Sequence, residues 1–279
     1  MNMERMDGQV VVITGGSSGV GLAVGKGLAR LGARTVLISR REQNARHAVD
    51  EVRRASGNDA VEFAIGDLTD LVAVKALVSD LERRLPRIDA LVSAAGTVGE
   101  RGVTASGIPR SFATNYLGHF SLIRAALPLL NRAPHGRILV VGAAPALVKQ
   151  LRAVNYDAVT PEASAAALLT QSLAWKLLLA HHLAVTHPEG PPMTVFHPGL
   201  IRSNLLNDLA LPLRLVGTVS NLFAKDHCAV AEDLASATPV AGVSGQMVDD
   251  HGRRVQLPAL VTTEHAARVW RASVAMTER

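Results

Sequence analysis

The stretch Val11-Val12-Ile13-Thr14-Gly15-Gly16-Ser17-Ser18-Gly19-Val20-Gly21, close to the start of the chain, decides the fold. Its first half is a run of β-branched apolar residues, which is typical of a buried strand. Its second half is a glycine-rich turn, and a helical pattern follows over residues 21–31. The segment therefore predicts a strand, a tight turn and a helix in direct succession.

The same alternation continues along the chain. The apolar runs cover residues 10–13, 35–38, 61–65, 90–93, 138–141 and 193–196, and the amphipathic stretches cover 21–31, 42–54, 72–84 and 111–130. Strands that alternate with helices predict crossover units and a parallel sheet with helices on both faces, the doubly wound Rossmann architecture of the α/β class. No linker or internal repeat interrupts the pattern, so we expect a single domain over residues 1–279.

Composition restricts the classes of function. A chain of 279 residues of which 48% are hydrophobic can bury a large core. The net charge is +5, but the basic residues are scattered and not interleaved with aromatic ones. We therefore expect no nucleic-acid binding, and only a mild attraction for anionic ligands. No apolar run approaches the roughly 20 residues of a membrane-spanning helix, so no membrane span is expected.

The cysteine and histidine content restricts the chemistry further. The single cysteine, Cys228, excludes an internal disulfide, and the ten histidines show no paired ligand spacing. We therefore expect no metal site. The first residues do not have the pattern of a signal peptide. Together these observations predict a cytoplasmic protein.

The turn after the first predicted strand is suited to a dinucleotide. A helix N-terminus presents free N–H groups and a positive dipole end to a pyrophosphate, and glycines let the phosphate approach the backbone. A merely tight turn uses the same residues, but a position directly after the first strand favours dinucleotide binding. The expected contacts are Thr14, Gly15, Ser17, Ser18, Gly19, Val20 and Gly21.

The end of the second predicted strand distinguishes between the two nicotinamide dinucleotides. An acidic residue binds the ribose 2′-hydroxyl of NAD at this point, whereas this chain has Ser39-Arg40-Arg41 and no acid before Glu42. Arginines suit a 2′-phosphate, so we expect NADP(H) in preference to NAD(H). Solvated charges at the start of a helix are the alternative. The cofactor-binding half would then cover about residues 1–145, and the substrate-side half about 146–279.

A further cofactor contact is expected after the third predicted strand, in Gly66-Asp67-Leu68. The Asp67 carboxylate could accept a hydrogen bond from the adenine amino group, with Leu68 beside it. A helix cap explains an aspartate at this position equally well.

Further motifs resemble the short-chain dehydrogenase/reductase family. The turn from Thr14 to Gly21 is similar to the cofactor turn of that family, and Ser93-Ala94-Ala95-Gly96 resembles its Asn-Asn-Ala-Gly motif with serine in the first position. Asn115-Tyr116-Leu117-Gly118-His119-Phe120 and His197-Pro198-Gly199-Leu200-Ile201-Arg202-Ser203-Asn204-Leu205 are similar to motifs of the retinol dehydrogenase and WW-domain oxidoreductase branch. The resemblance covers nearly the whole chain and implies the same Rossmann fold.

The resemblance implies additional cofactor contacts and an assembly. The implied contacts are Ser93, Ala94, Ala95 and Gly96 in one segment, and Pro198, Gly199, Ile201 and Ser203 in another. Ser203 corresponds to the position that contacts the nicotinamide amide. In the family, helices matching about 111–130 and 162–184 form the four-helix bundle of a dimer, so a homodimer or homotetramer is expected.

The resemblance also implies a catalytic set that this chain does not complete. Family members use a serine, a tyrosine, a lysine four residues after the tyrosine, and an asparagine that Asn115 matches. Ala143 stands in the place of the serine after the fifth predicted strand. Tyr156 lies at a typical interval from it, but landmarks in the following helix also allow Val159 or Pro161 at the tyrosine position.

No alignment supplies the lysine, because none lies between Lys149 and Lys176. The spacing of four matters because it stacks the two side chains on one helical face, where the ammonium can act on the phenol. A tyrosine without that help has a pKa of about 10 and is a poor acid–base catalyst at neutral pH. Packing for Tyr156 and backbone hydrogen bonding for Asn115 are the alternatives to catalytic roles.

These observations lead to three hypotheses about function. The first is an atypical enzyme that catalyses a redox-neutral step, such as cyclisation, elimination or isomerisation, on a small apolar metabolite. The second is a non-catalytic NADP(H)-binding or partner protein. The third is an unconventional NADP-dependent oxidoreductase that uses acids such as Asp157 or Glu162. Candidate polar groups for a site are Ser93, Asn115, Tyr156, Asp157, Glu162 and Ser203.

Overall fold

The computed structural model describes residues 5–97, 100–142, 145–149, 151–152, 154–197, 229–236 and 244–278. Five residues assigned to the site from the sequence lie outside this part of the chain: Ala143, Pro198, Gly199, Ile201 and Ser203.

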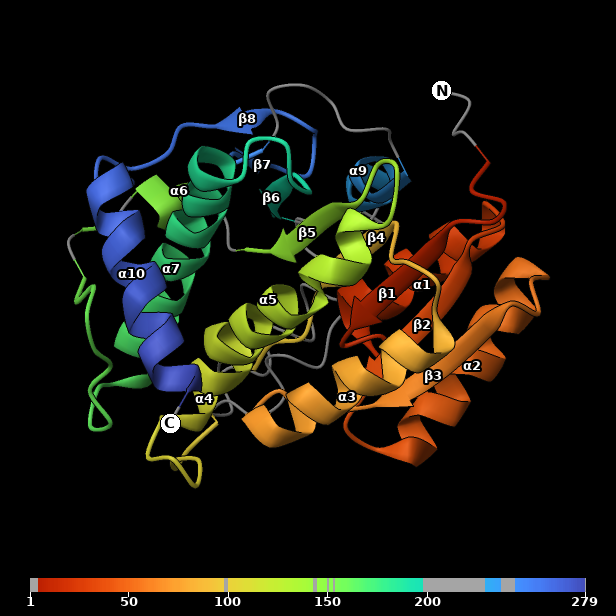
Figure 1. The fold of residues 1–279 in the computed structure, drawn as a ribbon, viewed down its shortest axis with the longest axis horizontal. Helices are drawn as coiled ribbons and strands as arrows, with labels where there is room; N and C mark the ends of the chain where they lie inside the picture. Colours follow the sequence, from red (N-terminus) through yellow and green to blue (C-terminus); the bar gives the residue numbers. More distant parts are fainter. Residues whose placement is uncertain are drawn as a thin grey trace.

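A single twisted sheet forms the centre of the described fold (Figure 1). Its strands are β1 (Val10–Thr14), β2 (Arg34–Ser39), β3 (Val61–Ile65), β4 (Ala90–Ser93), β5 (Arg137–Val141), β6 (Met193–Phe196), β7 (Met247–Val248) and β8 (Arg254–Val255). They lie in the order β3-β2-β1-β4-β5-β6-β7-β8, and each neighbouring pair is parallel except β7 and β8. The order reverses between β1 and β4, as in a doubly wound sheet.

Helices cover both faces of the sheet. On one face lie α1 (Gly19–Arg30), α2 (Glu42–Ser56) and α9 (Ala229–Ser236). On the other face lie α3 (Leu71–Arg84), α4 (Arg110–Phe112), η1 (Ala113–Leu117), α5 (Gly118–Asn131), α7 (Ala165–Thr186) and α10 (Thr263–Thr277). A short helix, α6 (Pro145–Lys149), follows β5. The predicted α/β fold with a largely parallel sheet is confirmed.

Strand β1 shows why its sequence is apolar without interruption. Val10 and Val12 pack into the core under α3 and α5, whereas Val11 and Ile13 pack into the core under α1 and α2. Successive side chains of a strand point to opposite faces, so a central strand with helices on both sides needs an apolar residue at every position.

The helix predicted over 111–130 is interrupted in the structure. Residues Ala113–Leu117 form a π-helical turn, η1, between α4 and α5. Single π-turns inside helices occur frequently at functional sites, because they change the direction of the side chains they carry. This turn carries Asn115.

Helix α7 is apolar around most of its circumference, and the chain itself covers it. The helix packs against α10, β6, α4 and η1 (Figure 1). Its buried residues include Trp175, which makes edge contacts with Phe112 and Tyr116. Packing within the chain thus accounts for the apolar residues in the middle of the helix, whereas Leu169 and Val185 near its two ends are exposed. The predicted dimer stays a prediction. Within the described residues, no helix combines the length and the hydrophobicity that crossing a membrane requires.

Candidate functional site

A pocket of about 450 Å³ lies at the edge of the sheet where the parallel strands end. The pocket contains residues that follow β1, β2, β3, β4 and β5, and a helical wall from α7. Ligands of open α/β sheets bind at this edge, close to the point where the strand order reverses. Residues assigned from the sequence that line it are Thr14, Gly15, Ser17, Ser18, Gly19, Val20, Ser39, Arg40, Arg41, Asp67, Leu68, Ala94, Ala95, Gly96 and Asn115.

Five of the assigned residues within the described chain are not part of the lining. These are Gly21, Ser93, Tyr156, Asp157 and Glu162. Residues that line the pocket and were not assigned from the sequence are Ile38, Asn44, Gly66, Thr97, Thr114, Val141, Gly142, Leu169, Leu173 and Lys176.

The glycine turn brings backbone segments into very close approach. Gly15 has a positive φ of 65°, and a Cβ on it would lie 2.9 Å from Cα of Ala95. A Cβ on Gly21 would lie 2.5 Å from the carbonyl oxygen of Gly15, which is closer than any side chain tolerates. Gly21 therefore shapes the turn by allowing α1 to start against it, without lining the pocket itself.

The N-terminus of α1 opens on the pocket, and among the described residues no acidic side chain of its first turn and no N-cap side chain engages it. Ser18 is the N-cap residue, but its side chain makes no capping hydrogen bond, and the first turn contains no acidic residue. The N-terminal N–H groups of a helix have no partners within the helix. The pocket therefore offers an anion both free backbone donors and the positive end of a helix dipole.

Thr14 connects the ends of β1 and β4. Its Oγ1 accepts hydrogen bonds from the backbone N–H groups of Ala94 and Ala95, at 3.0 and 3.2 Å. The neighbouring Ser93 is fully buried at the end of β4, and its hydroxyl has no hydrogen-bond partner within the described residues. Thr14 thus holds the turn over 94–96 against the glycine turn, and Ser93 does not line the pocket.

The end of β2 carries the basic rim of the pocket. The hydroxyl of Ser39 lies 3.1 Å from that of Ser17, which places two hydroxyl groups side by side. Arg40 is 3.5 Å from the carboxylate of Glu100, whereas Arg41 is exposed and has no acidic partner within the described residues. Arg41 is therefore free to pair with an anionic group of a ligand.

Asp67 closes the turn after β3. Its Oδ1 accepts hydrogen bonds from both the backbone N–H and the hydroxyl of Thr69, each at 2.8 Å. The N-cap of α3 is Asp70, which accepts hydrogen bonds from the N–H groups of Val72 and Ala73. The helix-cap explanation therefore belongs to Asp70, and Asp67 lines the pocket.

Asn115 joins the π-helical turn to the loop after β4. Its Oδ1 accepts from the N–H of Thr97 and its Nδ2 donates to the carbonyl of Thr97, both at 2.9 Å. Both ends of the amide are thus used by one residue of the loop. This pairing fixes the loop that forms one wall of the pocket, so Asn115 has a structural role.

Neither tyrosine lines the pocket. Tyr116 is buried, its hydroxyl lies 2.8 Å from that of Ser273, and burial raises its pKa well above the usual value. Tyr156 stacks on His265 of α10 with ring centroids 4.0 Å apart, and the Arg268 guanidinium lies over the Tyr156 ring at 5.2 Å from its centroid. The structure thus places Tyr156 in the packing of α10.

Asp157 and Glu162, the acids suggested in place of the catalytic tyrosine, also lie outside the pocket. Asp157 forms an ion pair with Arg268, and this contact lowers the pKa of the carboxyl. Glu162 is exposed before α7. Neither residue lines the pocket.

Lys176 is the ionisable residue that sequence reasoning missed. It lies on the same face of α7 as Leu169 and Leu173, seven and three residues earlier, and all three line the pocket. Its Nζ donates a hydrogen bond of 2.8 Å to the carbonyl of Val141, the last residue of β5. Burial lowers the pKa of Lys176 to about 8. A search for lysine four residues after a tyrosine could not find it.

His119 is a buried residue of α5 that does not itself line the pocket. Its Nε2 is 2.8 Å from the carbonyl oxygen of Ala95. Burial, and secondarily the positive charge of Lys176, lower its pKa to about 3, so the imidazole is neutral at physiological pH. A neutral imidazole bonded to a carbonyl must place its proton on that nitrogen. His119 is therefore a hydrogen-bonded support for the loop after β4.

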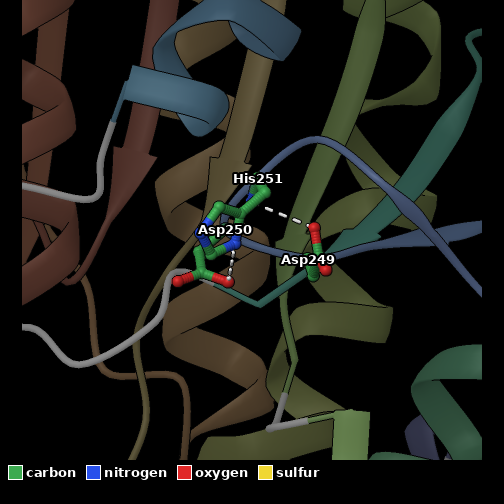
Figure 2. A group of neighbouring side chains, drawn as sticks. All are labelled: Asp249, Asp250 and His251. Atoms are coloured by element: carbon green, nitrogen blue, oxygen red, sulfur yellow. Dashed lines mark hydrogen bonds and ion pairs between the residues drawn. The ribbon is translucent and has the colours of Figure 1, made fainter.

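Outside the pocket, Asp249, Asp250 and His251 bring possible ligand atoms within 4.8 Å of one another (Figure 2). They form the turn between β7 and β8. Oδ1 of Asp249 accepts from the N–H groups of His251 and Arg253, at 3.0 and 2.9 Å, and Oδ2 accepts from Nε of Arg253. Asp250 and His251 contact each other at 3.1 Å. These contacts account for the group as the closure of a hairpin, and we do not assign a metal to it.

Comparison with known proteins places this site in a family. Residues 9–185 match the family described as short chain dehydrogenase. Retinol dehydrogenase 14 of Homo sapiens is 31% identical over 97% of this chain and 87% of its own length. Polyprenol dehydrogenase of Homo sapiens is 26% identical over 96% of this chain and 85% of its own length. The chain belongs to the short-chain dehydrogenase family, as the motifs in its sequence indicated.

Solved structures agree with this fold. RhlG of Pseudomonas aeruginosa, in complex with NADP, has a TM-score of 0.67 and 22% identity, over 89% of this chain and 97% of its own. A short chain dehydrogenase of Escherichia coli CFT073, in complex with NADPH, has a TM-score of 0.71 and 18% identity, over 90% of this chain and 99% of its own. At these identities the likeness establishes the fold alone.

Proposed function

We propose that the chain binds NADP(H) along the pocket. The observation that carries the proposal is the N-terminus of α1, which faces the pocket with no side-chain cap and no acidic residue in its first turn. Such a terminus favours a pyrophosphate. The close approach of Gly15 to the backbone of Ala95 holds the glycine turn against the loop after β4, and both segments line the pocket. The complexes of two proteins of similar fold with NADP and NADPH support the same ligand class here.

The basic rim favours the phosphorylated form of the cofactor. Arg41 has no acidic partner among the described residues, and the hydroxyls of Ser17 and Ser39 lie beside it at the end of β2. These groups would hold a 2′-phosphate, and Asp67 would accept from the adenine amino group. When it is bound, NADP(H) supplies hydride-transfer chemistry. Whether that chemistry is used depends on the residues at the inner end of the pocket, which are Leu169, Leu173 and Lys176 of α7.

We infer further that the chain acts on a small apolar metabolite in a redox-neutral step such as cyclisation, elimination or isomerisation. The face of α7 toward the pocket presents Leu169 and Leu173, four residues apart, which are apolar and offer no proton, and Lys176 is the ionisable side chain on that face. Tyr156 packs against His265, away from the pocket. The names of the relatives, retinol and polyprenol dehydrogenases, support an apolar ligand. Orientation and exclusion of water can accelerate such steps with few polar groups.

The second candidate is an NADP(H)-dependent oxidoreductase that acts on an apolar alcohol or carbonyl compound. It is favoured by the 31% identity to retinol dehydrogenase 14 over nearly the whole chain. In this case Lys176, which lines the pocket and has a pKa of about 8, is the group available to exchange a proton at neutral pH.

Calorimetric titration with NADPH and NADP⁺ tests cofactor binding. The informative variant is Gly19→Asp, which places a carboxylate where the pyrophosphate would bind. Because Gly19 has a positive φ of 52°, a side chain there also strains the backbone. Gly19→Ala is therefore the matched control, since it has the same strain without the charge. We expect micromolar binding in the wild type, a modest loss in Gly19→Ala and complete loss in Gly19→Asp. No binding to the wild type at millimolar cofactor would refute the proposal.

The absorbance of NADPH at 340 nm separates the two candidate activities. Incubation with a panel of apolar alcohols, aldehydes and ketones, followed by mass spectrometry of the products, should give a product isomeric with its substrate while the absorbance stays constant. Loss of absorbance in proportion to product would establish the oxidoreductase instead. Binding of NADPH without any conversion would leave a cofactor-binding protein.

A further inference from the structure

Lys176 lines the pocket, and the proposed binding of NADP(H) assigns it no role. The side chain of Lys176 is partly exposed, and it forms part of the pocket wall. Among the described residues its Nζ makes one hydrogen bond, to the carbonyl of Val141 at 2.8 Å. An ammonium has three donors and a neutral amine has two and a lone pair. The Val141 carbonyl therefore fixes the position of the nitrogen while leaving it able to contact a ligand.

The surroundings of Lys176 disfavour its positive charge. Leu169, Leu173, Val141 and Gly142 form the adjacent wall of the pocket, and no described carboxylate pairs with the ammonium. Among the described residues, the imidazole of His119 on α5 interacts electrostatically with the Lys176 ammonium. The other ionisable side chains that line the pocket are Arg40, Arg41 and Asp67, and the elements packed against α7 carry Arg110, Tyr116, Glu264, His265, Arg268 and Arg271. His119 is neutral at physiological pH, as shown above. The burial of Lys176, which brings its pKa to about 8, thus leaves an appreciable fraction as the free amine near neutral pH.

We propose that Lys176 is a nucleophilic amine that captures an apolar aldehyde or ketone in the pocket as an imine. The Nζ lone pair forms a bond to the carbonyl carbon, and a proton moves from nitrogen to the oxygen, which gives a carbinolamine. The carbon–oxygen bond then breaks, the oxygen leaves as water after protonation by solvent, and a protonated imine remains. Addition of water reverses both steps and releases the carbonyl compound and the amine. No oxidant or reductant takes part.

An imine at Lys176 would activate an apolar carbonyl ligand for a reaction in the pocket. The protonated imine withdraws electrons from the neighbouring carbon, so a proton is lost from that carbon more readily than from the parent aldehyde or ketone. Double-bond migration, elimination and ring closure all start with such a loss. The inference deepens the redox-neutral function proposed above, but it does not require NADP(H) to be bound.

Reductive trapping tests the inference directly. The purified protein is treated with hexanal and cyanoborohydride at pH 7, and the alkylated lysines are located by tandem mass spectrometry. The chain has five lysines, so each site can be followed separately. At pH 7 a lysine with a pKa of about 8 is roughly 200-fold richer in free amine than an ordinary exposed lysine. We expect alkylation of Lys176 at least tenfold faster than that of the exposed Lys75.

The pH profile of trapping distinguishes a pocket amine from adventitious labelling. The rate at Lys176 should level off above about pH 8. An ordinary lysine, with a pKa of about 10.4, is labelled faster up to about pH 10, and Lys75 is the exposed comparison. Equal rates at the two lysines at pH 7, or a Lys176 rate that rises throughout, would overturn the inference. Lys176→Arg keeps a donor for the Val141 carbonyl but cannot form the imine. Its circular dichroism spectrum should match that of the folded wild type, and alkylation should be lost at position 176 only.

A parallel NADPH titration of the same wild-type protein keeps the two proposals separate. Selective trapping at Lys176 without NADPH binding would support the imine and refute the cofactor proposal. NADPH binding without selective trapping at Lys176 would support the cofactor proposal and refute the imine.

Discussion

The ammonium of Lys176 in α7 donates a hydrogen bond of 2.8 Å to the carbonyl oxygen of Val141, the last residue of β5. This contact connects a helix to the end of a central strand, at a point where the pocket is otherwise apolar. A positive charge is thus held where water is largely excluded and no acid compensates it. Such an arrangement costs stability, which makes it measurable apart from any activity.

The first prediction concerns stability as a function of pH. Burial lowers the pKa of Lys176 to about 8 in the folded protein, against about 10.4 for an unfolded lysine. Between these values the unfolded state binds more protons than the folded state, so stability rises with pH. Below pH 8 both states are charged and the full cost, about 3 kcal/mol, is present. We therefore expect the free energy of unfolding of the wild type to increase from pH 7 to pH 10 relative to Lys176→Met.

Urea unfolding of both proteins at pH 7, 8, 9 and 10 measures this difference. Lys176→Met keeps the length of the side chain and removes the titration. Lys75→Met, at an exposed position, is the control and should show no such change. Parallel curves for the wild type and Lys176→Met at all four pH values would contradict the burial of the charge.

The second prediction concerns the selectivity between the two dinucleotides. Arg41→Ala removes the unpaired guanidinium at the end of β2. A charge-assisted hydrogen bond is worth about 1.5 to 3 kcal/mol, so NADPH should bind roughly 10- to 100-fold more weakly, with NADH unaffected. Calorimetry with both cofactors measures the effect. Arg46→Ala is the control, because Arg46 pairs with Glu42 and does not line this pocket. An equal loss of affinity for NADPH and NADH would assign Arg41 a different role.

The third prediction concerns the glycine turn. In Gly21→Ala the new Cβ would lie 2.5 Å from the carbonyl oxygen of Gly15, so the start of α1 must move away from the turn. We expect a loss of about 1 to 3 kcal/mol in stability and at least a tenfold loss of NADPH affinity, although Gly21 does not line the pocket. Gly57→Ala is the matched control: Gly57 has a φ of 68° at the end of α2, with open space around it. It should lose stability through backbone strain but bind NADPH normally, as thermal unfolding and calorimetry would show.

Much of the fold could be predicted because its signals are local. The strands of the central sheet are buried on both faces, so runs such as Val10–Thr14 stand out as continuous apolar segments. The edge at which they end was predictable for the same reason, since parallel strands place their carboxyl ends together. The two-residue strands β7 and β8 are too short to produce a pattern. The π-helical turn at Ala113–Leu117 has no periodic signal that distinguishes it from the helices beside it.

The inner end of the pocket could not be predicted, because its residues come together only in three dimensions. Lys176 reaches the end of β5 from 35 positions away in the chain. Its relation to Leu169 and Leu173 depends on which face of α7 meets the pocket, and α7 is apolar around most of its circumference. The sequence therefore contained no amphipathic pattern from which to choose that face. Likewise Ser93 and Tyr156 were assigned by motif position, which does not determine where a side chain points.

The fourth prediction concerns the pairing of Asn115 with Thr97. Asn115→Ala removes both hydrogen bonds and leaves the N–H and the carbonyl of Thr97 without partners. We expect a loss of about 1 to 3 kcal/mol in the free energy of unfolding. Asn115→Asp retains the acceptor for the Thr97 N–H but opposes a carboxylate oxygen to the Thr97 carbonyl, so it should be no better than alanine. Urea unfolding measures both variants, and a neutral effect of either would show that the loop does not depend on this pairing.

The fifth prediction compares the two tyrosines, which differ in the partners of their hydroxyl groups. Tyr116 is fully buried and its hydroxyl pairs with Ser273 at 2.8 Å, so Tyr116→Phe leaves the Ser273 hydroxyl with one partner fewer and should cost about 1 kcal/mol. Tyr156 contributes its ring, which contacts His265 and Arg268, so Tyr156→Phe should change stability by less than about 0.5 kcal/mol. Because Tyr156 lies outside the pocket lining, NADPH affinity and any turnover should also be unchanged in Tyr156→Phe. Loss of turnover with intact stability would instead make the Tyr156 hydroxyl a catalytic group, and would require the segment that carries it to move toward the pocket when substrate binds.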